Sequence, residues 1–484
     1  MVVIKSNESK SALRRRKPFC GASNAVIKIL ESLKKIMKKL IMAKFYLALL
    51  LAFIFSVSVK AQEKPCPNTD KNHLQGAYRF SDGRIVSIVP TSAAGQWRYT
   101  DFNSGKSHKL YPTDAFNFQS ADDWGSENPV VFRYRFNPDK NGAAESLVIK
   151  QNGKGDLIAK KIKFREQTIT FKSGDIQLFG KLTLPINGKT PFKTVVMVHG
   201  SDNEGSVDRD WFPHVLAANG IATFVFDKRG TGCSEGKYTQ HFGVLSDDVV
   251  AALRWLKTRP EVDGNRIGLA GFSQGGWVAP LSALKDSSVK FVLVGYGMAM
   301  SVAEEDRLEA PLKLKELGLD AESIAQFQEL NSSLHKVAKG NFKDYREFEE
   351  MIAKYKDAKW FATVKGTQTW AGSVLAMGIE QAKIVAPQMF ETFFQPFYEP
   401  VPTLESLNIP MLWLIAKDDI EAPPEPTIAV LKRLRSEGKP FATVIFPNTN
   451  HGITEFVIRD ERRVTTKYAN DYFSIMMKWI KGQK

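Results

Sequence analysis

Residues 271–275 read Gly-Phe-Ser-Gln-Gly and follow the apolar run 266–270, which predicts a buried strand. A helix is expected to begin near Gly275. A serine at such a strand-to-helix turn has a strained backbone, so only small residues fit two positions before it and after it. Gly271 and Gly275 meet this requirement. The segment therefore predicts that Ser273 is a nucleophile held at the end of a strand, with a plain turn as the alternative.

On both sides of this turn, strand-like and helix-like segments alternate. A hairpin over 168–184 is expected to open the region. Strands alternating with helices indicate a mostly parallel sheet with helices on both faces. The expected strands are 194–198, 222–226, 291–294, 411–415 and 442–446, and the expected helices are 211–219, 245–258, 428–436 and 465–480.

A serine hydroxyl needs a base to become a strong nucleophile, and a histidine oriented by a carboxylate is the usual one. Of the seven histidines, His451 follows the last expected strand in a turn near the end of the chain. It is the predicted base, with a surface loop histidine as the alternative. The acid is expected after the strand 411–415, where the pattern alone leaves Asp418 and Asp419 both open.

A family resemblance separates these two aspartates. The segment 416–423, Ala-Lys-Asp-Asp-Ile-Glu-Ala-Pro, resembles the G-x-x-D-x-x-x-P run of many α/β-hydrolases, including relatives of prolyl oligopeptidase. The resemblance implies that Asp419 is the acid, although Ala416 stands where glycine is usual. The chain order Ser273, Asp419, His451 is also the order of that fold. The segment 227–234 is similar to the D-x-R-G-x-G-x-S run of the superfamily, and its expected role is structural.

An oxyanion hole requires two preorganised hydrogen-bond donors. One is expected to be the backbone N–H of Gln274, which follows the nucleophile. The resemblance implies that the second is the backbone N–H of Ser201, in the loop after the strand 194–198. His199 in the same loop is interpreted as structural, since as a base it would precede Ser273 in the chain.

The predicted fold class is α/β, an α/β-hydrolase fold with an inserted helical cap, preceded by a small β-rich domain. Residues 300–400 break the strand–helix alternation and predict the cap. Residues 62–165 carry short β-type runs separated by turn formers and predict a small antiparallel sheet or barrel of unknown role. The hydrolase domain is placed at 166–484, and the family resemblance covers 168–300 and 401–480.

The first 61 residues predict a leader. Basic residues precede an apolar run over 45–59, the order found in a secretory signal peptide. Cleavage is expected near Ala61, with an uncleaved anchor as the alternative and Met37 as a possible true start. The protein is therefore expected to be exported, to the periplasm or the outside, with no stable membrane anchor after cleavage.

The leader also explains the charge. The formal net charge is +15, but residues 1–61 hold 13 basic and two acidic residues. The remainder has 54 basic and 50 acidic residues, a net of +4, which excludes nucleic acid as an expected partner. The three cysteines, Cys20, Cys66 and Cys233, are too few for a disulfide framework. Free thiols are the default interpretation, and a pair between Cys66 and Cys233 stays open.

The predicted activity is hydrolysis of a small-molecule acyl substrate, most simply a carboxylic ester. A peptidase or amidase of the prolyl oligopeptidase type and a catalytically silent binding module are the alternatives. No metal or cofactor is expected, because the sequence has no HExxH, CxxC or P-loop pattern. Six cap aromatics suit an apolar substrate, although they could equally pack the cap: Trp360, Phe361, Trp370, Phe390, Phe393 and Phe394. The oligomeric state is left open.

Overall fold

The computed structural model describes residues 73–91 and 95–484, which all fall in one compact unit. The predicted signal peptide, its cleavage site and Met37 lie outside these residues, as do Cys20 and Cys66. Within the described ranges, no helix is both long enough and apolar enough to cross a membrane.

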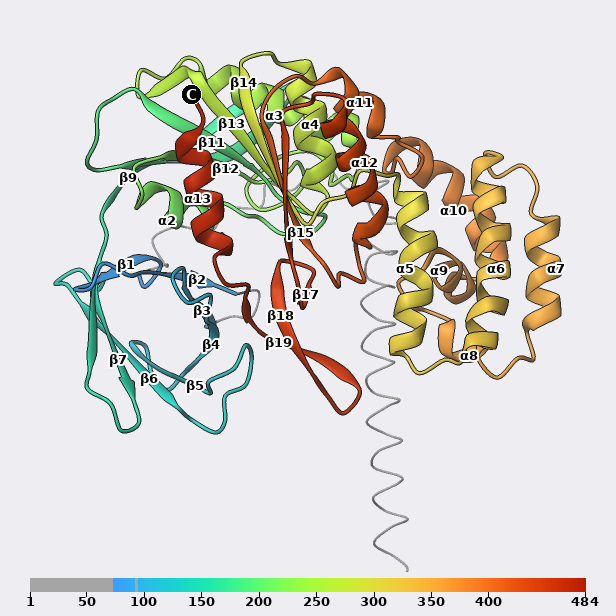
Figure 1. Ribbon diagram of the computed structural model, residues 1–484, viewed down its shortest axis with the longest axis horizontal. Helices are drawn as coiled ribbons and strands as arrows, with labels where there is room; N and C mark the ends of the chain where they lie inside the picture. The colour runs from blue at the N-terminus through green and yellow to red at the C-terminus, as the bar shows by residue number, and fades with distance from the viewer. Residues whose placement is uncertain (1–72, 92–94) are drawn as a thin grey trace, which may run out of the picture. The chain divides into compact units, whose positions relative to one another are not determined.

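The larger part of the molecule is built on an eight-stranded sheet (Figure 1). The two N-terminal strands form a ten-residue antiparallel hairpin, as expected, and the strands from β11 onward run parallel. In spatial order the strands are β16 (Phe441–Phe446), β15 (Met411–Ala416), β14 (Val289–Gly295), β13 (Val262–Phe272), β11 (Phe192–Val198), β12 (Ala222–Phe226), β10 (Ile176–Pro185) and β9 (Phe164–Ser173).

Helices cover both faces of this sheet, because nearly every residue of the central strands is buried and must be shielded from water on each side. One face packs against α3 (Phe242–Leu256), α4 (Gly275–Lys285), α11 (Val401–Ser406) and α12 (Pro424–Ser436). The other packs against α2 (Phe212–Ala217) and α13 (Tyr472–Gly482). Figure 1 shows α2 and α13 together on that second face.

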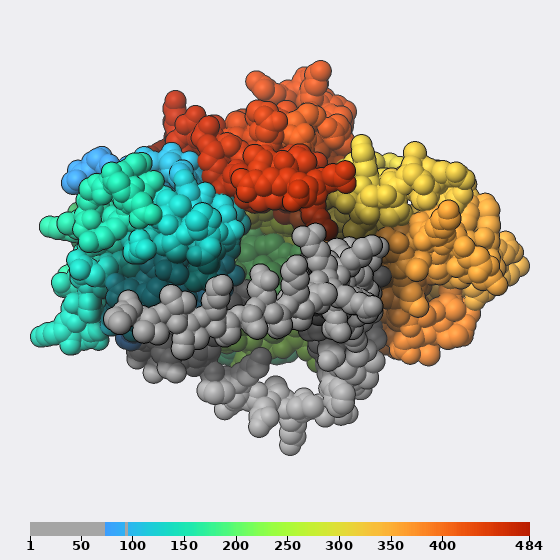
Figure 2. Space-filling model, turned by 90° about the horizontal axis from the view of Figure 1, so that it is seen from below, coloured from blue at the N-terminus to red at the C-terminus, as the bar shows by residue number. Residues whose placement is uncertain are grey.

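The predicted cap is helical and has its own hydrophobic core. It departs from the sheet after β14 and returns before α11, and its helices appear in yellow to orange in Figure 2. The helices are α5 (Val302–Glu316), α6 (Ala321–Lys339), α7 (Arg346–Tyr355), α8 (Phe361–Val364), α9 (Trp370–Met377) and α10 (Ile379–Thr392).

The β-rich domain is a closed antiparallel barrel of eight strands that pair in sequence order, with β8 closing onto β1. Alternate side chains fill its interior, including the fully buried Tyr78, Tyr134 and Phe136. The strands are β1 (Gly76–Phe80), β2 (Ile85–Pro90), β3 (Trp97–Asp101), β4 (Ser107–Pro112), β5 (Asn117–Ser120), β6 (Phe132–Pro138), β7 (Ala144–Gln151) and β8 (Leu157–Lys161).

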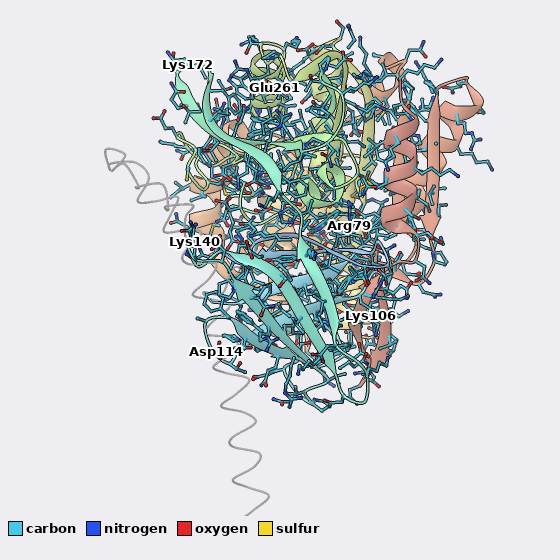
Figure 3. All side chains as sticks on the ribbon, turned by 90° about the vertical axis from the view of Figure 1, so that its left-hand side faces the viewer. Arg79, Lys106, Asp114, Lys140, Lys172 and Glu261 are labelled. Atoms are coloured by element: carbon cyan, nitrogen blue, oxygen red, sulfur yellow. The ribbon has the colours of Figure 1, made fainter. Side chains whose placement is uncertain are left out.

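The barrel is bonded and packed to the hydrolase part. Arg79 donates to the carbonyl of Ala218 at 3.1 Å, and Lys106 forms a β-bridge with Lys467. Arg79 and Lys106 are labelled in Figure 3. The ring of Phe102 lies 4.9 Å from that of Phe473 and belongs to the same hydrophobic cluster as α2 and α13. Barrel and hydrolase thus share a core.

Two predictions from the sequence are wrong, one about the segment after His451 and one about Cys233. The segment after the histidine turn was expected to be helical from Thr465, but it forms a small antiparallel sheet of β17 (Thr449–Asn450), β18 (Thr454–Arg459) and β19 (Arg462–Tyr468). β-branched residues such as Thr465, which pairs with Phe456, favour the strand, and the helix begins only at Tyr472. The free-thiol interpretation also fails for Cys233, which is disulfide-bonded.

Candidate active site

Ser273 sits on the sharp turn between β13 and α4 with a φ of 52°. This left-handed conformation is costly for a residue with a side chain and is held by close packing around the turn. A Cβ added to Gly271 would lie 2.1 Å from the carbonyl oxygen of Gly275, and one added to Gly275 would lie 2.1 Å from that of Val198. Both positions therefore require glycine, for the steric reason that the sequence suggests.

The structure brings Ser273, His451 and Asp419 into one hydrogen-bonded chain. Their side chains come from the carboxyl ends of three parallel strands, β13, β16 and β15, which meet at one edge of the sheet. The Oγ of Ser273 lies 3.1 Å from Nε2 of His451, and Nδ1 of His451 lies 2.8 Å from Oδ2 of Asp419. A carboxylate only accepts, so Nδ1 donates to it, and in the neutral imidazole this leaves Nε2 free to take the serine proton.

Asp419 rather than Asp418 occupies the acid position. It is buried, and its Oδ1 accepts from the backbone N–H groups of Glu421 at 2.9 Å and Ala422 at 3.0 Å. These two bonds fix the carboxylate so that Oδ2 faces the imidazole. Asp418 instead contributes its backbone, donating to the carbonyl of Thr449 at 3.0 Å.

The electrostatics favour a protonated histidine in the resting protein. Burial alone lowers the pKa of His451, but the negative charge and hydrogen bond of Asp419 outweigh it and raise the pKa to about 9. Glu421 and Glu305 add smaller contributions in the same direction. The ring of Tyr296 meets the imidazole edge-on at 4.8 Å and restricts its rotation.

The expected oxyanion donors lie next to the serine. Within the described part of the chain, neither the Gln274 N–H nor the Ser201 N–H donates to a protein acceptor. The loop before Ser201 passes close to the nucleophile, since a Cβ on Gly200 would lie 3.8 Å from the Oγ of Ser273. His199 is buried, and its Nδ1 lies 3.5 Å from Oδ2 of Asp202.

Lys228 fixes the same loop, a role that the sequence does not reveal. It is 4% exposed, and its Nζ donates to the carbonyl oxygen of Gly200 at 2.5 Å. Burial lowers the pKa of Lys228 to about 8. Because C=O and N–H point in opposite directions across a trans peptide, this bond orients the N–H of Ser201 and increases its polarity.

The other polar residues of the segment 227–234 hold loops together, which is the role expected from the sequence. The carboxylate of Asp227 accepts from the backbone N–H groups of Ser206, Val207 and Cys233 at 2.7 to 3.0 Å. Arg229 makes a bidentate pair with Asp248 of α3. These bonds tie the loop after β12 to the loop after β11, which carries the expected oxyanion donor.

The cap places acids near the histidine. Glu305 and Glu309 lie on one side of α5, and burial raises the pKa of both, that of Glu309 to about 7. Glu309 pairs with Lys313, whereas the Glu305 carboxyl has no hydrogen-bond or ion-pair partner among the described residues. Of the cap aromatics, Trp360 is buried against Phe327 and packs the cap core, and in the described structure no ring contact joins any of the six to His451.

A strained serine on a mostly parallel sheet, followed by an acid and a histidine at neighbouring strand ends, defines an α/β-hydrolase. The chain belongs to the family described as serine aminopeptidase, S33, whose model matches residues 189–455, more than half of the chain. The barrel and the C-terminal helix lie outside this match. The chain is therefore a hydrolase with an extra N-terminal domain.

Individual relatives are distant. An uncharacterized 31.7 kDa protein of Escherichia coli is 24% identical over 239 residues, which cover 49% of this chain and 76% of that protein. Esterase FrsA of Yersinia enterocolitica is 27% identical over 203 residues, 41% of this chain and 48% of the esterase. This chain thus spans about half of the esterase's length. The solved acylaminoacyl peptidase of Pyrococcus horikoshii aligns with a TM-score of 0.42 at 13% identity, covering 83% of this chain and 56% of the peptidase.

Proposed function

We propose that this protein is an exported serine hydrolase that cleaves carboxylic esters through Ser273, His451 and Asp419. The observation that carries the proposal is the continuous chain of contacts from Oγ through the imidazole to the buried carboxylate, at 3.1 and 2.8 Å. Serine becomes a strong nucleophile in this arrangement because the imidazole takes its proton as the new bond forms.

The proposed reaction has two halves. Oγ of Ser273 attacks the ester carbonyl carbon while Nε2 of His451 accepts the hydroxyl proton, and the carbonyl oxygen becomes an oxyanion facing the N–H groups of Gln274 and Ser201. The bond from carbon to the alcohol oxygen then breaks, and His451 gives its proton to the leaving alcohol. Water attacks the acyl-enzyme in the same way, releasing the acid and restoring the serine.

A fluorophosphonate probe tests the activated serine directly. The wild-type protein is expected to be labelled, and Ser273→Ala and His451→Ala to lose labelling. Ser201→Ala is the matched control, because it removes an exposed hydroxyl and keeps the backbone N–H, so its labelling should persist. A folded wild-type protein that takes no label would overturn the proposal and favour a silent binding module.

An aminopeptidase is the second candidate, favoured by Glu305. The Glu305 carboxyl has no ion-pair partner among the described residues and is electrostatically coupled to His451, so a substrate ammonium group bound beside it would stabilise its ionised form. The family's description is consistent with this activity. The wild-type protein would then hydrolyse aminoacyl p-nitroanilides, and Glu305→Gln would lose this activity but keep the hydrolysis of uncharged esters. This result would support the peptidase. Ester hydrolysis without anilide hydrolysis would support the esterase.

Export is supported by two features. The leader has the order of a secretory signal, and Cys233 is disulfide-bonded, which is typical of proteins outside the reducing cytosol. The mass of the mature protein recovered from the expressing cells tests this. A chain that begins near Gln62 agrees with export and cleavage, and a full-length chain retained in the cytosol contradicts it.

A further inference from the structure

A cavity of about 300 Å³ lies directly beside His451. Its wall is mostly aromatic and is assembled from the barrel, the start of α2, the end of β14, the histidine turn, β18, β19 and α13. The lining residues are Trp124, Trp211, Tyr296, His451, Gly452, Thr454, Thr465, Tyr468 and Tyr472. No described lining residue is a lysine, arginine, aspartate or glutamate.

The barrel supplies one side of this cavity through Trp124, in the loop between β5 and β6. The guanidinium of Arg98 lies 4.5 Å from the centre of the indole and also donates to the Trp124 carbonyl at 3.3 Å. The same loop is held by Asp123, whose Oδ1 accepts from the N–H groups of Gly125 and Ser126. These contacts therefore hold both the loop and the indole ring of Trp124 in place.

Contacts between the barrel and the hydrolase domain hold this aromatic wall in place. The rings of Trp124 and Tyr468 meet edge to face at 5.1 Å. Tyr468 in turn donates its backbone N–H to the carbonyl of Gly105 in the barrel at 2.8 Å. Because backbone bonds and a shared core join barrel to hydrolase, the aromatic wall is formed before any ligand arrives, which lowers the entropy cost of binding.

The chemistry of the lining selects a neutral aromatic group. Aromatic faces and edges bind another ring through offset and edge-to-face contacts. An apolar cavity of about 150 Å³ holds benzene, so this volume accommodates a substituted ring.

The location of the cavity identifies which part of the substrate it would hold. His451 and Gly452 line it, whereas Ser273 does not. In an ester hydrolysis the imidazole passes its proton to the departing alcohol, so the alcohol portion lies against the histidine when the carbonyl carbon lies against the serine. The cavity is thus on the leaving-group side of the reaction centre.

We propose that this cavity is the leaving-group subsite and that it selects esters whose alcohol carries an aromatic ring, with Trp124 of the barrel as a specificity-determining residue. The inference rests on the proposed esterase activity. It gives the barrel a function: the barrel completes a subsite that the hydrolase domain lacks on its own.

Three acetate esters with alkyl alcohols of similar leaving ability test the proposal: 2-phenylethyl, 2-cyclohexylethyl and ethyl acetate. We expect kcat/KM for the phenylethyl ester to exceed that for the cyclohexylethyl ester at least tenfold. Trp124→Ala should lose this preference through a higher KM, with ethyl acetate unchanged. Thr465→Trp, which fills the cavity from β19, should do the same. Ile158→Ala, an exposed barrel substitution, is the matched control and should leave all three rates unchanged.

A binding measurement separates this proposal from the proposed activity. By titration calorimetry, 2-phenylethanol should bind Ser273→Ala protein and bind at least tenfold more weakly when Trp124→Ala is added. If esters are hydrolysed but phenylethyl is not preferred and the alcohol does not bind, the subsite is refuted while the activity stands. If no ester is hydrolysed yet the alcohol binds in a Trp124-dependent way, the activity fails and the aromatic site stands. A kcat/KM for 2-cyclohexylethyl acetate equal to that for 2-phenylethyl acetate would overturn the proposed selectivity for an aromatic ring.

Discussion

The pKa of His451 predicts opposite responses of activity and stability to pH. The general base must be neutral, and with a pKa of about 9 only about one molecule in a hundred has a neutral His451 at pH 7. We therefore expect kcat/KM for ethyl acetate, which reports the free enzyme, to rise about tenfold per pH unit and to level off near pH 9.

Stability should move the other way. The folded state binds the His451 proton more tightly than the unfolded state, whose pKa is 6.5. The stabilisation is fully present below pH 6.5 and is lost as the pH rises through 9. The rise in the pKa of His451 from 6.5 to about 9 corresponds to about 3 kcal/mol in the free energy of unfolding.

The assay is release of acetic acid, followed by pH-stat from pH 6 to 10, with His451→Ala protein as the blank for spontaneous hydrolysis. Urea unfolding at the same pH values gives the stability. Asp419→Asn removes the main influence that raises this pKa, so its inflection should move to lower pH while kcat falls by about 10³ to 10⁴. Asp418→Asn is the matched control and should keep the wild-type profile. A wild-type plateau already reached below pH 7 would refute the reasoning.

Three further outcomes follow from individual contacts. Lys228→Met should lower kcat about tenfold with KM little changed, and Lys228→Arg should recover part of it; a change in KM alone would show that the lysine does not act through the oxyanion loop. Gly275→Ala should destabilise the protein by about 1–3 kcal/mol in urea unfolding, whereas Gly264→Ala, whose added Cβ would make only an ordinary contact with the Lys257 side chain at 4.0 Å, should not; equal effects would refute the steric argument. Reductant should lower the Tm of the wild type, and Cys233→Ser should remove this sensitivity; a wild type indifferent to reductant would contradict a stabilising disulfide.

The elements nearest Ser273 could be predicted because their signals are local. The turn needs glycine two residues before and after the serine, and parallel strands place the segments after β15 and β16 at the same sheet edge. For this reason Asp419 and His451 could be paired with Ser273, although His451 lies 178 residues away from it in the sequence.

Features that depend on contacts between distant segments could not be predicted. Lys228 has the sequence appearance of a loop lysine, and only the fold places it against Gly200. The segment around Trp124 does not indicate its place in a cavity, because its neighbours Arg98 and Tyr468 come from β3 and β19. The sequence predicts a helix at Thr465. The preference of its β-branched side chain for a strand determines the structure only because β18 lies beside it and pairs with it. The disulfide of Cys233 depends on spatial proximity, which spacing alone does not give.

The shared core of barrel and hydrolase constrains how such a two-domain gene can arise and change. Phe102 lies in a cluster with Trp211 and Phe473, so losing the barrel would leave large apolar side chains of the hydrolase facing water. A single deletion or fusion event between the barrel and the hydrolase domain would therefore lower the stability of the protein. Relatives that lack the barrel should have replaced the residues equivalent to Trp211 and Phe473 with polar ones, so the boundary should evolve as a linked set of positions.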